Sequence, residues 1–105
     1  METIVNNPQG NLLFLLKQQW HWIFFTHKEV FKKSCPIKIE CLSELCEPIT
    51  ITGSNLNSSC KLTIKIRSPS CIYYFNEIKP IIIISINEFF KSKIINDIHL
   101  IASNI

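Results

Sequence analysis

Four side chains of the types that bind zinc lie in the first half of the chain: His21, His27, Cys41 and Cys46. Five residues separate the histidines and four separate the cysteines, and both gaps occur in structural zinc sites. The chain has no C-x-x-C motif, however, and histidines six positions apart share a helix face less well than a pair four apart. We therefore keep a zinc-stabilised Cys/His domain as an alternative, and we expect buried thiols and no cofactor.

A second group of candidate residues is basic. Residues 60–67 alternate apolar and polar side chains without interruption, as a strand with one buried face does. The polar face carries Lys61, Lys65 and Arg67. Tyr73 lies on the next predicted strand. Cations can hold the phosphates of a nucleic acid, and a neighbouring aromatic ring can stack on a base. A nucleic-acid-binding module is therefore a further alternative, and the competing interpretation is the solvated side of a sheet.

A run of aromatic residues at positions 20–25 supplies a candidate surface for a protein partner. On a helix, Trp20 and Phe24 face one way and Trp22 points to nearly the opposite side. The first two therefore fit a core. We expect Trp22 to be exposed and assign it as a candidate binding residue. The competing interpretation makes residues 20–25 a strand, because aromatic and β-branched residues favour sheets.

Catalytic motifs are missing from the sequence. Cysteines and histidines are numerous enough for a nucleophile and its base, but no local pattern accompanies any of them. Asp97 is the only aspartate, which gives little support for carboxylate catalysis. The chain has two glycines, too few for a glycine-rich phosphate-binding loop. We expect a non-enzymatic interaction or accessory protein.

Composition limits the class of protein further. Hydrophobic residues make up 47% of the 105 residues and the net charge is +3, which argues against intrinsic disorder. An odd count of five cysteines, with no signal peptide or transmembrane segment in the pattern, predicts an intracellular, cytoplasmic protein. Isoleucine occurs 20 times, which indicates an AT-rich genome and leaves open a reading frame without an evolved function.

The elements that position these residues are predicted from periodicity. After a loose lead-in at residues 1–10, apolar residues recur every three or four positions and predict a helix over about 11–33. A second such pattern predicts a C-terminal helix over about 86–103. Between them, alternating or β-branched runs predict strands at residues 37–41, 49–52, 60–67, 71–75 and 81–84.

Together these elements predict one α+β domain over residues 11–105. Its sheet, within residues 37–86, is expected to have four or five mostly antiparallel strands covered by the two helices. Residues 49–52 and 60–67 are expected to pair as a hairpin. The isoleucine run at 81–84 follows a proline and is continuously apolar, which predicts a central strand buried on both faces.

One short segment resembles a known signature. Residues 49–56, Ile-Thr-Ile-Thr-Gly-Ser-Asn-Leu, are similar to the strand and turn of the immunoglobulin-like fold shared by plexins and transcription factors. The likeness covers eight residues of 105, and helices at both ends of the chain do not belong to that fold. No function is carried over from it.

Overall fold

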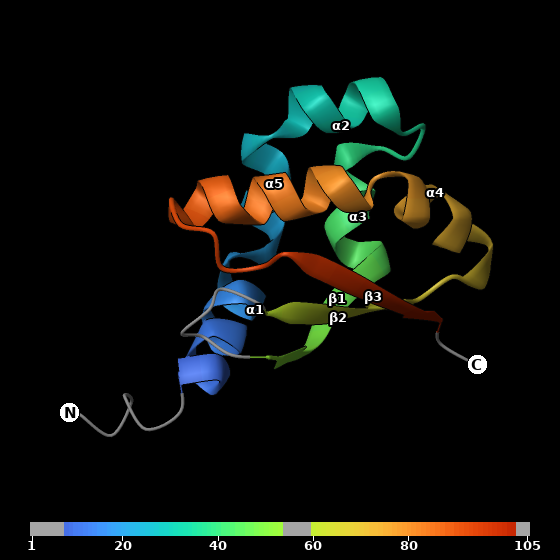
Figure 1. The fold of residues 1–105 in the computed structure, drawn as a ribbon. Coiled ribbons are helices and arrows are strands. Elements are labelled where there is room, and N and C mark those ends of the chain that lie inside the picture. The colour runs from blue at the N-terminus through green and yellow to red at the C-terminus, as the bar shows by residue number, and fades with distance from the viewer. Residues whose placement is uncertain (1–7, 54–59, 103–105) are drawn as a thin grey trace.

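The computed structural model describes residues 8–53 and 60–102, and in these it has five α-helices and one three-stranded sheet (Figure 1). The α+β class is confirmed, whereas the prediction of four or five strands is wrong. The elements in chain order are α1 (Pro8–Thr26), α2 (Lys28–Ser34), α3 (Ile39–Leu45), β1 (Cys46–Thr52), β2 (Lys61–Ile66), the 3-10 turn η2 (Pro69–Cys71), α4 (Ile72–Glu77), α5 (Lys79–Phe90) and β3 (Asp97–Ala102).

The predicted N-terminal helix is two helices. Residues 20–25 are helical as expected, but α1 ends at Thr26 and α2 begins at Lys28. His27 between them leaves helical geometry, with φ −114° and ψ 26°. After α2 the backbone becomes extended at Cys35, because the residue before a proline disfavours the helical region. No helix in the described residues has the length and apolar character needed to cross a membrane.

The hairpin is confirmed. β1 and β2 pair antiparallel, with Ile51 opposite Leu62 and Cys46 opposite Ile66, and a bulge interrupts the register between Pro48 and Thr50. A bulge there suits a proline, which cannot donate to the ladder. The loop expected at residues 53–59 lies almost entirely outside the described residues. β2 is the central strand of the sheet, so the predicted central position of residues 81–84 is wrong.

Three of the predicted strands are helical. The isoleucine run lies in α5, where Pro80 occupies the first turn and the buried Ile82 and Ile86 are four positions apart. A short continuous apolar run fits a buried helix as well as a buried strand, so periodicity could not separate them. Residues 37–41 lead into α3, and residues 71–75 lie in η2 and α4. The alternation at residues 37–41 and the continuous apolar and aromatic run at residues 71–75 both extend over too few residues to exclude a helical turn.

The predicted C-terminal helix is wrong beyond Phe90. The backbone at Lys91 is left-handed, with φ 56°, and the chain returns as β3 parallel to β2. The side chain of Asn87 fixes this return. Its Oδ1 accepts hydrogen bonds from the amides of Ile94 and Ile95, both at 3.0 Å, and its Nδ2 donates to the carbonyl of Ile95 at 2.8 Å. The spacing of apolar residues cannot predict these hydrogen bonds, because they are made by a polar side chain.

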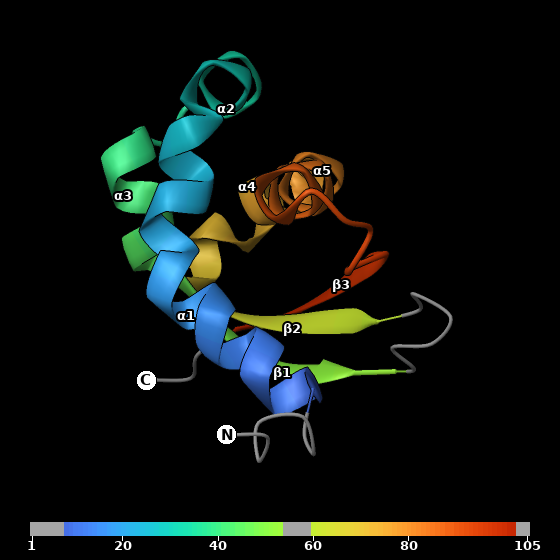
Figure 2. The same ribbon diagram turned by 90° about the vertical axis from the view of Figure 1, so that its left-hand side faces the viewer.

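One face of the sheet carries the hydrophobic core. The buried strand residues include Leu62, Ile64 and Ile66 on β2 and Ile98 on β3. Helix α1 packs against β1, while α4 and α5 contact β3 (Figures 1 and 2). On the opposite face, outward side chains such as Lys61 are exposed. The alternation of β2 therefore separates core from solvent, as the sequence predicts for this strand.

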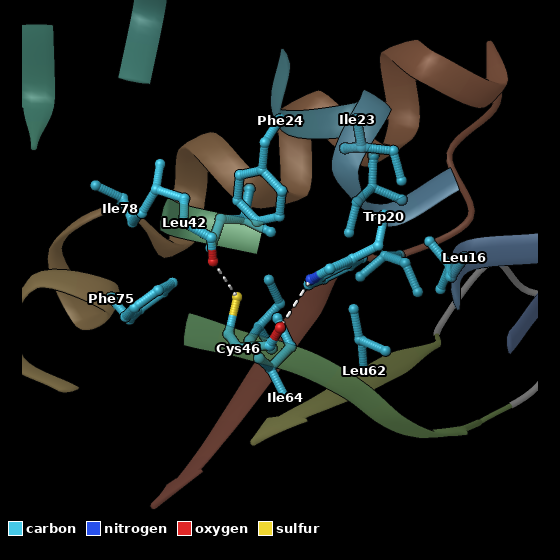
Figure 3. Packing of buried hydrophobic residues seen from close by; sticks show 14 of the residues in the cluster. Leu16, Trp20, Ile23, Phe24, Leu42, Cys46, Leu62, Ile64, Phe75 and Ile78 are labelled. Carbon is cyan, nitrogen blue, oxygen red and sulfur yellow. Dashed lines mark hydrogen bonds between the residues drawn. The ribbon is translucent and has the colours of Figure 1, made fainter. Parts of the chain in front are cut away.

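Helix α1 is joined to the core by a hydrogen bond as well as by packing (Figure 3). The indole Nε1 of Trp20 donates to the carbonyl of Cys46 at 3.1 Å, and the thiol of Cys46 donates to the carbonyl of Leu42 at 3.1 Å. The Trp20 ring meets the edge of Phe24 with centroids 5.1 Å apart. The inner face of α1 is thereby fixed in position and in rotation about its axis.

Candidate functional site

The four candidate zinc ligands have separate environments. Cys41 is exposed on α3, whereas Cys46 is completely buried at the start of β1. His21 Nδ1 lies 3.0 Å from the hydroxyl of Ser43. His27 Nε2 lies 3.3 Å from Glu88 Oε1, and its Nδ1 lies 3.0 Å from the carbonyl of Ile23. Across residues 8–53 and 60–102, no three His, Cys, Asp or Glu side chains form a group that could hold a metal.

The chemistry of Cys46 opposes metal binding further. Burial raises the pKa of its thiol to about 12, and the positive charge of Arg67 offsets only part of that effect. Zinc binds the thiolate, so a thiol held protonated in the core is a poor ligand. Its hydrogen is already donated to Leu42. In the part of the chain that the structure describes, these side chains therefore form no arrangement that supports the zinc hypothesis.

The basic residues of β2 lie beside acidic neighbours. Lys65 is directly opposite Glu47 on β1, and Lys61 is directly opposite Asp97 on β3. Side chains at such positions are about 5 Å apart at Cβ and interact. Arg67 Nη2 lies 3.7 Å from the same Glu47. Among the described residues, only Arg67 of these three cations has a carboxylate within ion-pair distance, but Glu47 and Asp97 lower the net positive charge of this face and with it the attraction for a phosphate backbone.

Tyr73 does not lie on a neighbouring strand. It is on α4, where it is exposed and its ring meets that of Tyr74 edge-on at 5.6 Å. The expectation of an aromatic side chain on the strand next to Lys61 and Lys65 is therefore wrong. Its cause is the assignment of residues 71–75 as a strand.

Exposed apolar side chains gather instead on the face of α1 that points away from the core. Phe14 is 60% exposed and Trp22 is 52% exposed, and Leu15 and Phe25 are also exposed. We call these four side chains, with Gln18 and His21 between them, the outer face of α1. Trp22 is exposed, as its spacing from Trp20 predicts.

Three rings of the outer face contact one another. The rings of His21 and Phe25 are stacked with centroids 5.9 Å apart, and Trp22 meets both of them edge-on at 5.4 and 5.7 Å. The Nζ of Lys28 lies 4.6 Å from the Phe25 centroid, a cation–π geometry. These contacts hold the rings in defined positions, although all three are in contact with solvent.

An open pocket of about 640 Å³ continues from the outer face at the end of α1. Phe25, Ile37 and Ile39 supply apolar lining, and Lys28, Lys32 and Lys38 add positive charge. Glu29 and Glu40 also line it, so its net charge is small. Within the described residues, none of these three lysines has a carboxylate within ion-pair distance. The pocket therefore extends the apolar surface and borders it with cations.

Apolar side chains lie on both sides of α1. Leu16, Trp20, Ile23 and Phe24 are buried on its inner face, and Lys17 is its only charged residue. Large apolar side chains gathered on the uncovered side of a helix mark a candidate interaction surface. Sequence reasoning identified Trp22 but missed Phe14 and Leu15. A signal for both was available, because Phe14, Gln18, Trp22 and Phe25 recur at steps of four, four and three, and Leu15 lies seven positions before Trp22.

No family model, curated protein or solved structure matches this chain.

Proposed function

We propose that this chain is a small, non-enzymatic protein-interaction domain whose contact surface is the outer face of α1. The observation that carries the proposal is the apolar character of α1 on its uncovered side. Exposed aromatic clusters rimmed by polar residues are typical of protein interfaces, and Trp and Tyr dominate their energetics. Trp22 and Phe25 are the residues expected to contribute most.

The packing of α1 on the core supports the same proposal. Its inner face packs in the core, and the Trp20–Cys46 hydrogen bond restrains the helix. Side chains on a helix held in this way lose little conformational freedom when a partner binds. The ring contacts of His21, Trp22 and Phe25 restrict rotamers further. Because these rings are already ordered before a partner binds, we assign them a role in binding and not in the folding of the chain.

The proposal is tested by replacing the two aromatic anchors together. Tagged wild-type protein, the double variant Trp22→Ser, Phe25→Ser and the control Tyr73→Ser are compared for the proteins that each retains from cells expressing the chain. Tyr73 is a matched control because it is an exposed aromatic residue on α4. We expect the control to retain the wild-type partners and the double variant to lose them. Retention of the same partners by the double variant would contradict the proposal.

A further inference from the structure

The seam of the outer face has the spacing of a coiled coil. Phe14, Gln18, His21 and Phe25 follow at steps of four, three and four, which is the 3.5-residue repeat that keeps a stripe facing a partner helix. All four are exposed. They span twelve residues, from Phe14 to Phe25, or about 16 Å along the helix axis. Leu15 and Trp22, seven positions apart, lie together on one flank of this seam.

The order of steps is the same in both directions. A second α1 running antiparallel would therefore place Phe14 opposite Phe25 at both ends of the contact, and Gln18 opposite His21 at the two positions between them. Apolar side chains meet apolar ones, and an amide meets an imidazole that can hydrogen-bond to it. On the flank, Leu15 of one copy would approach Trp22 of the other. In a parallel arrangement, each seam residue would instead face the same residue of the other copy, and the two His21 rings would meet.

Charge permits this contact. The seam contains no charged residue, and α1 has no Asp or Glu at all. An acidic or basic partner helix would find little to pair with on the seam, whereas a second copy of it leaves no buried charge. Lys17 lies off the seam and can stay in water. In Figure 2, no other labelled element crosses in front of α1 over most of its length.

The available area suits a weak, reversible dimer. Aromatic side chains present about 150–250 Å² each, so four side chains exposed by about half offer roughly 400 Å² per copy. With the polar rim, two copies would bury on the order of 1,000 Å², the lower limit of specific interfaces. Interfaces at this lower limit are typically weak and transient, and we expect a dissociation constant on the order of 1–100 µM.

We infer that the partner of the outer face of α1 is a second copy of this chain, bound by antiparallel α1–α1 packing. This inference rests on the proposed function and names its partner. In the dimer the two seams cover each other, with Phe14 against Phe25 at each end. The pockets at the ends of the two α1 helices then lie at opposite ends of the contact.

The first experiment measures mass in solution against concentration by sedimentation equilibrium. The wild-type chain is expected to rise from its monomer mass of 12.2 kDa towards twice that value with increasing concentration. Replacing Phe14 and Phe25 together by Ser should weaken association at least tenfold. The control Ile84→Ser removes a comparably exposed residue from α5 and should leave association unchanged. Circular dichroism and cooperative unfolding check that each variant is folded.

The second experiment tests the direction of the helices. The variants Phe14→Lys and Phe25→Glu are each expected to be monomeric, because one seam end then carries a charge opposite an apolar ring. Their equimolar mixture should regain the dimer, because antiparallel packing places the introduced ammonium opposite the introduced carboxylate. At the other end of that heterodimer, the unchanged Phe25 and Phe14 still meet. Failure of the mixture to associate more tightly than either variant alone would overturn the antiparallel arrangement.

The outcomes separate the two proposals. A wild-type chain that stays monomeric up to about 100 µM overturns the second-copy inference. If that monomer still loses a different protein partner in the Trp22→Ser, Phe25→Ser variant, the proposed function stands without it. If the chain dimerises and the Ser variants at positions 14 and 25 dimerise equally well, the second-copy inference fails, and the proposed function fails with it only if the Trp22→Ser, Phe25→Ser variant also retains all wild-type partners.

Discussion

The two faces of α1 differ in what their tryptophans contact. Trp20 is 5% exposed, donates a hydrogen bond to the carbonyl of Cys46 and meets the ring of Phe24. Trp22, two positions further on, is 52% exposed and contacts only His21 and Phe25 among the ring pairs of the described residues. Residue type therefore does not decide the role of either tryptophan. Position on the helix does.

The difference indicates how the helix is used. The inner face is sufficient to anchor α1, since four large side chains are buried on it. The outer face adds exposed apolar surface that the fold of a single copy does not need, and such surface lowers solubility unless a partner covers it. A change on the inner face should therefore alter stability, and a change on the outer face should alter association.

The largest expected effect is on the inner face. Trp20→Ala removes a buried ring and leaves the carbonyl of Cys46 without its donor, so we expect the free energy of unfolding to fall by about 3–5 kcal/mol. Trp22→Ala is the matched control and should change it by less than about 0.5 kcal/mol under monomeric conditions. Urea unfolding followed by circular dichroism measures both. Equal losses for the two variants would remove the distinction between the faces.

The core beneath the inner face of α1 should also be sensitive to alkaline pH, because it contains the buried thiol of Cys46. The pKa of Cys46 is raised to about 12 from the ordinary value of 9.0, so the folded state keeps this proton where the unfolded state loses it. The contribution of the Cys46 thiol to the free energy of unfolding is complete below pH 9.0. It falls as the pH rises towards 12, by at most about 1.4 kcal/mol per pH unit. Urea midpoints at about pH 8 and about pH 10 measure the loss. Cys46→Ala should show a smaller loss than the wild type, whereas Cys41→Ala, at an exposed site, should show the same loss.

Contacts within the outer face should contribute little to the stability of one copy. The ammonium of Lys28 lies over the ring of Phe25, and an exposed cation–π contact contributes about 0.5–1 kcal/mol. A double-mutant cycle with Lys28→Gln and Phe25→Leu isolates this coupling. A coupling above about 2 kcal/mol would mean that Phe25 is part of the core rather than of a binding surface.

The outer face of the sheet provides the smallest expected effect. Replacing Lys61, Lys65 and Arg67 together by Ser removes three cations that face Asp97 and Glu47 across the sheet. Exposed pairs of this kind contribute little, so we expect a change within about 1 kcal/mol and no change in association. Thermal unfolding and sedimentation measure the two quantities. Loss of association in this variant would move the interface from α1 to the sheet.

The sequence predicted those parts of the fold that depend on long or regular patterns. The α1 periodicity extends over many residues, and β2 alternates throughout its length, so both elements and the hairpin were identified. The isoleucine run at 81–84 was assigned to a strand because continuous apolar residues have no period. Its helical state depends on Pro80 at the first turn and on packing of Ile82 and Ile86, which only the tertiary structure decides.

The path beyond α5 could not be predicted for a different reason. Apolar residues at 90, 94, 98 and 101 fit a helix, but three hydrogen bonds of Asn87 end it and direct the chain into β3. In the candidate site, Trp22 was predicted from helical geometry. Phe14 and Leu15 were missed because an apolar run of five residues suggests burial, although a helix turns consecutive residues to different sides.

The most direct test compares the two tryptophans within one sample. Protein labelled with 5-fluorotryptophan should give two fluorine resonances, which the variant Trp22→Phe assigns. With increasing concentration, the Trp22 resonance is expected to shift and to lose its sensitivity to exchange of H₂O for D₂O, because the second copy covers it. The Trp20 resonance should remain unchanged. A Trp22 resonance that stays solvent-sensitive while the mass doubles would contradict the assignment of the outer face of α1 as the interface.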